Sequence, residues 1–212
     1  MRKAKRERLM SELYAGKIIL KPAAVARLRI RDRYSLHRMV LELYPHLEGD
    51  AKETSVRDVQ WADRGEHLAG REVLLLSNRP PMTEGLPDDV RVMVKKLPDS
   101  FLEHETYRIR MDVNPCRCVD GRHRAVPRGE LENWLHDKAK RSGFSFTHLQ
   151  IGRYGATRFT KEGHRVTFAE LRVDGIVRVL DTDLFKQTVA NGFGRGKAFG
   201  YGLMQIIPIS LQ

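Results

Sequence analysis

A tyrosine and a histidine, Tyr34 and His37, stand three positions apart in a segment whose apolar residues repeat with helical spacing. Leu36, Val40 and Leu43 form the apolar stripe, and about 100° of turn per residue places Tyr34 opposite Leu36. Residues three apart share a helix face, so both rings are expected side by side and away from the core. Histidine titrates near neutral pH and can give or take a proton during catalysis. The spacing by itself also fits a surface histidine and tyrosine without a catalytic role.

A second candidate site is a glycine-rich basic segment at residues 191–203, with the sequence NGFGRGKAFGYGL. Glycine lets the backbone adopt positive φ and approach a partner closely, and successive N–H groups can then form an anion-binding concavity. The glycine spacing fits neither the dinucleotide-binding motif nor the P-loop. One interpretation is phosphate contact, and the other is that the glycines serve only turns and close packing. The candidate phosphate-binding residues are Gly192, Gly194, Arg195, Gly196 and Lys197.

The charge of the chain favours an anionic partner, because the formal net charge is +11 and the isoelectric point about 9.9. Such an excess favours nucleic acid or, less readily, an anionic membrane. The basic residues are clustered near the N-terminus, in a central segment and in a later one, although each cluster also fits a solvated face. The candidate nucleic-acid-binding residues outside the glycine-rich segment are Arg38, Arg117, Arg122, Arg124, Arg153, Arg158, Lys161 and Arg165.

Metal-ligand motifs are missing from the sequence, so we expect no metal and no cofactor. It has no H-E-x-x-H, no EF-hand loop and no clustered carboxylate pair. Cys116 and Cys118 are the only cysteines, too few for a zinc site of about four ligands, and we expect reduced thiols in a cytoplasmic protein.

No apolar stretch approaches the roughly 20 residues of a membrane span, so no membrane association is expected. Metal-free cleavage of nucleic acid needs an internal nucleophile, which RNA has in its 2′-hydroxyl.

The first half of the chain is predicted to place the tyrosine and histidine on its first helix. That helix begins after Asp32 as N-cap and runs to about Tyr44, before Pro45. A strand over residues 17–25 precedes it, bent or confined to an edge by Pro22. Strands over residues 56–62 and 72–77 follow, then a turn-rich connection over residues 79–87 and a segment, 88–96, that fits helix or strand.

The second half repeats this order more clearly. The expected elements are a strand over 107–113, a helix from Pro127 to about Arg141, strands over 144–154 and 166–179 joined by a basic hairpin around 155–164, a helix over 182–190 capped by Asp181, and a strand over 203–209. Strand-helix-strand-strand-helix-strand is the ferredoxin-like order. We therefore predict an α+β protein with two tandem ferredoxin-like (RRM-like) βαββαβ domains, residues 13–100 and 101–212, after a basic extension over residues 1–12.

The glycine-rich segment resembles that of the repeat-associated RNA-binding superfamily found in CRISPR systems. Residues 17–23 (KIILKPA), 34–37 (YSLH) and 107–115 (YRIRMDVNP) precede it in the order seen in one branch of that superfamily. This branch comprises the CRISPR repeat-processing endoribonucleases of type I-E systems, often called CasE. The resemblance covers about residues 13 to 210, and its specificity comes from the ordered occurrence of several short motifs.

The resemblance implies two tandem ferredoxin-like folds and metal-independent cleavage of the repeat stem-loop in precursor CRISPR RNA. Such cleavage leaves a 5′-hydroxyl and a 2′,3′-cyclic phosphate, and the enzyme usually keeps its product within the type I-E interference complex, Cascade. By position, His37 resembles the catalytic histidine of the family and Tyr34 its accompanying tyrosine. Residues 153–165 resemble the basic hairpin that enters the RNA stem. The implied partners are the CRISPR repeat hairpin, the mature crRNA and other Cascade subunits.

Two other interpretations remain at this point. Residues 197–203 faintly resemble the aromatic strand motif of RNA-recognition domains, which fits a non-catalytic CRISPR-associated RNA-binding subunit. However, Ala198 stands where that motif has glycine. The third interpretation is a DNA-binding or structural protein whose basic surface acts only through its charge.

Overall fold

The computed structural model describes residues 12–45 and 59–209 of the chain. They form two compact units. The described part of the first unit is residues 12–45, 59–97 and 198–200, and that of the second is residues 98–197 and 201–209. Each unit has its own four-stranded antiparallel sheet. The predicted extension lies outside the described residues, except for residue 12.

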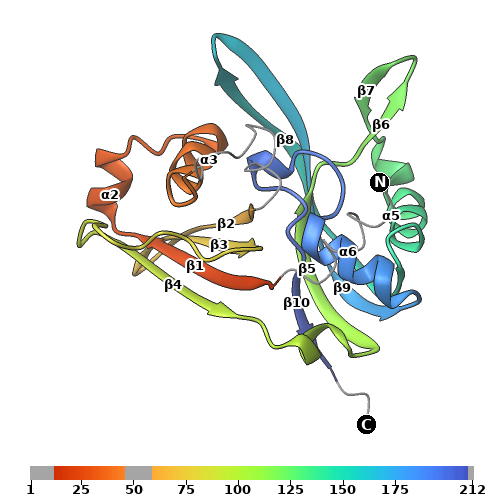
Figure 1. The fold of residues 1–212 in the computed structure, drawn as a ribbon. Helices are drawn as coiled ribbons and strands as arrows, with labels where there is room; N and C mark the ends of the chain where they lie inside the picture. The colour runs from red at the N-terminus through yellow and green to blue at the C-terminus, as the bar shows by residue number, and fades with distance from the viewer. Residues whose placement is uncertain (1–11, 46–58, 210–212) are drawn as a thin grey trace. The chain divides into compact units, whose positions relative to one another are not determined.

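The first unit contains the elements β1 (Tyr14–Leu20), α2 (Pro22–Arg27), α3 (Arg33–Glu42), β2 (Val59–His67), β3 (Gly70–Ser77) and β4 (Val90–Lys96). Its sheet has the ferredoxin-like order β2-β3-β1-β4. Both helices cover the same face of this sheet, since Ala24 of α2 and Leu36 of α3 belong to one buried cluster with Ile18 and Val73 of the strands (Figure 1). Its fold therefore agrees with the predicted class.

Two features of the first unit differ from the expected pattern. The strand predicted over residues 17–25 ends at Leu20, and the prediction is wrong beyond it, because Pro22 begins helix α2 instead. Proline is well suited to a first helical position, and the alanines after it favour helix. The second helix of the ferredoxin-like pattern is replaced by a loop over residues 78–89, where Pro80, Pro81 and Pro87 disfavour a helix. The segment that fitted helix or strand is strand β4.

The second unit contains the short 3₁₀ helix η2 (Asp99–Leu102) and the elements β5 (Thr106–Val113), β6 (Cys116–Val119), β7 (Arg122–Ala125), η3 (Arg128–Glu130), α5 (Leu131–Lys140), β8 (Phe144–Lys161), β9 (His164–Val179), α6 (Thr182–Asn191) and β10 (Gln205–Pro208). A last 3₁₀ turn, η4 (Lys197–Phe199), begins in this unit. The sheet order β10-β5-β9-β8 is again ferredoxin-like. Both helices lie on one face, because Phe144 contacts Phe185 of α6 while Phe146, two residues along the strand, contacts His136 of α5.

Strands β8 and β9 are longer than predicted. The expected basic hairpin around residues 155–164 is not a separate element but the outer part of one continuous two-stranded ribbon. Residues 164–170 of β9 pair only with β8, and the ribbon turns at Glu162 and Gly163, both with positive φ. This turn suits a two-residue hairpin. Figure 1 shows the teal end of the ribbon extending past the other strands of its sheet.

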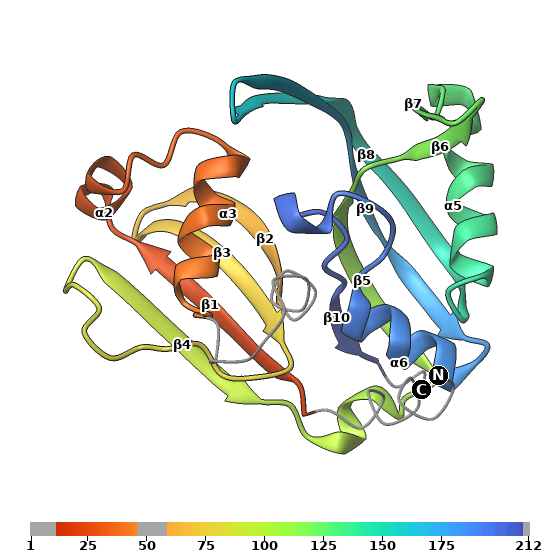
Figure 2. The same ribbon diagram turned by 45° about the horizontal axis from the view of Figure 1, so that its top comes forward.

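A second hairpin, β6–β7, was not predicted. It inserts between β5 and α5, and its strands pair from Cys116 with Ala125 to Val119 with Arg122 (Figure 2). Asp120 and Gly121 form its turn, and both have positive φ. The Asp-Gly pair is a strong hairpin signal when it separates two strand-like runs. The signal was present in the sequence, within the segment that was noted only for its charge.

Candidate active site and nucleic-acid interface

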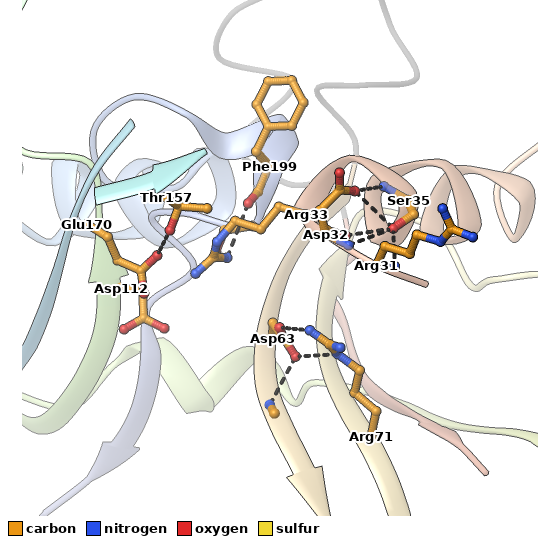
Figure 3. Close-up of polar contacts among 12 residues, drawn as sticks. Arg31, Asp32, Arg33, Ser35, Asp63, Arg71, Asp112, Thr157, Glu170 and Phe199 are labelled. Carbon is orange, nitrogen blue, oxygen red and sulfur yellow. Dashed lines mark hydrogen bonds and ion pairs between the residues drawn. The ribbon is translucent and has the colours of Figure 1, made fainter. Parts of the chain in front are cut away.

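Helix α3 is held at its start by a capping box that the sequence predicted in part. Asp32 is the N-cap, and its Oδ1 accepts a hydrogen bond from the Ser35 N–H at 2.8 Å (Figure 3). The Ser35 hydroxyl oxygen in turn accepts from the Asp32 N–H at 3.0 Å. This reciprocal arrangement satisfies two backbone donors that would otherwise lack partners. The first turn, which carries Tyr34, is therefore fixed locally.

The same helix brings Tyr34 and His37 together. The predicted apolar stripe is buried, with Leu36 and Val40 fully inaccessible. Tyr34 and His37 are half-buried, and their ring centroids are 6.4 Å apart. Arg38 is exposed. The predicted helix and its two faces are thus confirmed, and an imidazole that can exchange protons lies beside a phenol that can donate a hydrogen bond.

Phe199 is a third ring at this site. It belongs to the short segment Ala198–Gly200, which is part of the first unit, and its ring centroid is 5.5 Å from that of His37. Two buried side chains, Trp61 of β2 and Arg33 of α3, donate hydrogen bonds to the carbonyl groups of this segment. Sequence reasoning missed all three residues as parts of the site, since no local pattern connects them with His37.

Outside Ala198–Gly200, the glycine-rich segment belongs to the second unit and is held there by backbone hydrogen bonds. The Phe193 N–H donates to the Gly202 carbonyl at 2.8 Å, and the Gly202 N–H donates to the Asp112 carbonyl at 2.7 Å. A Cβ at Gly202 would lie 2.3 Å from the Phe193 carbonyl oxygen, so this glycine serves close packing. Gly192 is buried at the end of α6, which also gives it a conformational role.

The basic part of that segment is more accessible. Gly194 and Gly196 are half-buried with φ of +85° and +81°, Arg195 is exposed, and Lys197 is half-buried. This geometry fits both interpretations of the sequence: the close packing is observed, and phosphate contact stays a prediction. Glycines near its ends are packed, while Arg195 and Lys197 present positive charge.

Lys138 of α5 adds a cation that sequence reasoning missed. Its Nζ lies 5.5 Å from the centroid of the Phe193 ring and 5.9 Å from that of Trp134. Burial lowers the pKa of Lys138, and the positive charges of Arg141 and then Arg195 lower it further. Burial also lowers the pKa of Lys197, with a contribution from Lys138. Within residues 12–45 and 59–209, no carboxylate forms an ion pair with these two lysines, so their charge remains available to an anion.

The remaining basic candidates lie on the two hairpins of the second unit. Arg122 and Arg124 are exposed on β7, whereas the Arg117 guanidinium donates hydrogen bonds to the Glu130 carboxylate. Arg153 is exposed at an irregularity in the β8–β9 register.

Arg158 and Arg165 lie on one face of the β8–β9 ribbon. Arg158 and Thr160 are two residues apart on β8 and therefore share a face, and Arg165 of β9 pairs directly with Thr160. Lys161 is on the opposite face, together with Phe159. The ribbon therefore has an arginine face, and we use that term for the surface that carries Arg158 and Arg165.

The part of the chain that the structure describes contains neither a metal-binding cluster nor a membrane-spanning helix. No group of three or more His, Cys, Asp or Glu side chains in this part of the chain is arranged to hold a metal ion. No described helix is long and apolar enough to cross a membrane. Cys116 and Cys118 are free thiols.

Comparison with known proteins identifies the family. The chain belongs to the CRISPR associated protein family, whose model matches residues 13–208. The family expected from the sequence motifs is therefore confirmed. No curated protein sequence matches the chain.

Solved structures share its fold. Cse3 of Thermus thermophilus, bound to an RNA representing a pre-cleavage complex, matches with a TM-score of 0.78 at 21% identity, over 93% of this chain and 100% of that one. Cas6e from Escherichia coli str. K-12 matches with a TM-score of 0.68 at 18% identity, over 92% and 100% of the two chains. A chain of a CRISPR RNA-guided surveillance complex matches with a TM-score of 0.67 at 19% identity, also over 92% and 100%.

Proposed function

We propose that this protein is a metal-independent endoribonuclease that cleaves the repeat stem-loop of precursor CRISPR RNA. The observation that carries the proposal is the placement of His37 beside Tyr34 on the outward face of a firmly capped helix. Family membership and a fold shared with RNA-bound Cse3, which is described as a CRISPR endoribonuclease, support the choice of reaction and substrate.

The proposed reaction uses the RNA as its own nucleophile. The 2′-hydroxyl oxygen attacks the adjacent phosphorus in line, a P–O bond forms, and the bond to the 5′-oxygen breaks. Protonated His37 donates a proton to the leaving 5′-oxygen while water takes the proton of the 2′-hydroxyl, or neutral His37 accepts that proton while water protonates the 5′-oxygen. Tyr34 orients the hydroxyl or the phosphate through a hydrogen bond. The products carry a 2′,3′-cyclic phosphate and a 5′-hydroxyl.

Negative charge on the pentacoordinate phosphorus requires a positive group, for which Arg38, Lys161 and Lys197 are the candidates. The stem itself is bound through its phosphates and its A-form shape by basic residues of the second unit: Arg117, Arg122, Arg124, Arg153, Arg158, Arg165 and the glycine-rich segment. The match to a chain of a CRISPR RNA-guided surveillance complex supports retention of the cleaved RNA within Cascade.

Cleavage of a labelled CRISPR-type hairpin RNA in EDTA tests the reaction, beside a copy with a 2′-deoxy substitution at the cut site. We expect cutting of the first RNA and none of the second, because the substitution removes the nucleophile. Cutting of both, or activity only with added metal, would contradict the mechanism. Tight binding without cutting, across several repeat sequences, would favour the non-catalytic RNA-binding subunit instead.

His37→Ala tests the residue assignment. Loss of a general acid or base typically costs about 10²- to 10⁴-fold in rate, so cleavage should fall by that order while the affinity for the 2′-deoxy hairpin stays close to wild type. Single-turnover kinetics and equilibrium binding give the two quantities. An alanine variant that cleaves like wild type would remove His37 from the mechanism.

A further inference from the structure

We propose that Trp61 and Arg33 are positioning residues that hold Phe199 against the imidazole of His37. The inference builds on the proposed function, since it concerns the geometry of the histidine assigned to proton transfer. Neither residue is placed to react itself. Both act through the segment Ala198–Gly200, which we term the clamped segment.

The first support is the pattern of hydrogen bonds on three successive carbonyl groups. The Trp61 indole Nε1 donates to the Ala198 carbonyl at 3.1 Å. Arg33 Nη1 donates to the Phe199 carbonyl at 3.3 Å and lies 3.4 Å from the Gly200 carbonyl (Figure 3). Buried polar side chains require partners, and Trp61 and Arg33 are only 1% and 9% exposed. The clamped segment supplies these partners from a distant part of the sequence.

The second support is the tight fit of Gly200. Its φ is +78°, and a Cβ at this position would lie 2.5 to 2.8 Å from three carbons of the Trp61 ring. The backbone therefore rests directly on the indole face, and any larger residue would move it away. The indole thus holds the clamped segment both by its N–H group and by its ring surface.

The consequence concerns the middle residue of the clamped segment. With Ala198 and Gly200 held on either side, the Phe199 ring is placed 5.5 Å from the His37 ring at a tilt of 55°, within the range where aromatic pairs attract. The ring of Tyr34, on the same helix, has its centroid 6.4 Å from that of His37. Since proton transfer depends on orientation, a misplacement of about 1 Å can cost about 10²-fold in rate. Trp61 and Arg33 therefore affect cleavage through Phe199 and His37.

Nuclear magnetic resonance of the free protein tests this arrangement without any reaction. The imidazole proton signals of His37, assigned by their loss in His37→Ala, carry the ring-current shift of Phe199, which Phe199→Leu removes. We expect Trp61→Phe, which keeps a ring but loses the indole N–H, and Gly200→Ala to move these signals toward their positions in Phe199→Leu. Gly85→Ala is the matched control, because its φ is +72° and its Cβ would meet open space. Wild-type His37 signals in both Trp61→Phe and Gly200→Ala would overturn the proposal.

A kinetic arm then connects the arrangement with cleavage. At saturating hairpin RNA, Trp61→Phe and Gly200→Ala should lower the single-turnover rate by about 10- to 10²-fold, while the affinity for the 2′-deoxy hairpin is unchanged. Shifted resonances with wild-type cleavage would reject the positioning role. If the wild-type protein itself does not cleave, the proposed function fails, whereas the resonance experiment still decides whether the clamp exists. Trp61→Phe keeps the test valid if Gly200→Ala does not fold.

Discussion

At Lys138, the positive charge opposes folding in the free protein and would be stabilised by a bound phosphate. Its ammonium group lies over two aromatic rings, beside Arg141 and Arg195. Burial and these neighbours lower its pKa, so the charged form opposes folding at neutral pH, and this opposition fades as the pH rises past the lowered pKa. A phosphate would act in the other direction. It stabilises the protonated form, so RNA binding should raise the pKa of Lys138 and take up protons when the pH lies near that pKa.

Lys138→Met separates the two effects. Methionine keeps the packing on Trp134 and Phe193 but removes the charge, so the free protein should melt at a slightly higher temperature. Its affinity for hairpin RNA should fall, with a loss of about 0.7 to 0.9 from the magnitude of the logarithmic salt slope for one phosphate contact. Lys140→Met is the control, because Lys140 is exposed on the same helix. Equal RNA affinity of wild type and Lys138→Met would remove Lys138 from the binding surface.

The β8–β9 ribbon presents its charges unevenly. Its arginine face carries Arg158 and Arg165, while the opposite face holds Phe159, which is 5% exposed and contacts Phe168. A ribbon packed on one side and charged on the other has a defined face for an RNA stem. This refines the expectation from the sequence, which grouped all basic residues of the hairpin together.

Arg158→Ala with Arg165→Ala should therefore reduce the salt dependence of RNA binding. Two lost phosphate contacts correspond to about 1.4 to 1.8 in the magnitude of the logarithmic slope. Dissociation constants measured across a salt series give this slope. The double variant Arg91→Ala with Lys95→Ala is the control, since both residues are exposed and lie on the same face of one strand, β4, outside the ribbon. An unchanged slope in the arginine variant would show that the ribbon does not bind the stem.

The elements that the sequence predicted well are those with strong local signals. Asp32 and Asp181 cap their helices as expected, and the buried face of α3 follows from the spacing of its apolar residues. Pro22 was misassigned because proline fits both a bent strand and a first helical turn. The Asp-Gly turn of β6–β7 is a local signal of the same strength, and it indicates a hairpin that the charge pattern of this segment does not.

The candidate site was predictable only on its own helix. Tyr34 and His37 are three residues apart, so helical periodicity alone places them together. Phe199, Trp61 and Arg33 join the site through hydrogen bonds between segments far apart in the chain, and no periodicity encodes such contacts. Lys138 was hidden for the same reason, because its neighbours Arg195 and Phe193 come from another element.

At the scale of the whole molecule, the net charge of +11 attracts any polyanion, so charge alone does not distinguish RNA from DNA. Discrimination must come from the A-form shape and the 2′-hydroxyl groups of the stem. We therefore expect similar binding of hairpin RNA and duplex DNA at low salt, and a preference for the RNA that grows as salt is raised. Competition experiments at matched ionic strength measure this preference. Equal affinities at every salt concentration would favour a purely electrostatic role.

The assignment of Ala198–Gly200 to the first unit has a consequence for how the protein is made. A chain synthesised from its N-terminus completes Arg33 and Trp61 long before residues 198–200 leave the ribosome. Until then, the indole and guanidinium donors lack the backbone acceptors that they have in the finished protein. The contact of His37 with Phe199 can therefore form only after almost the whole chain has emerged, so an interrupted chain that ends near the unit boundary at residue 97 would contain the histidine but not the clamp.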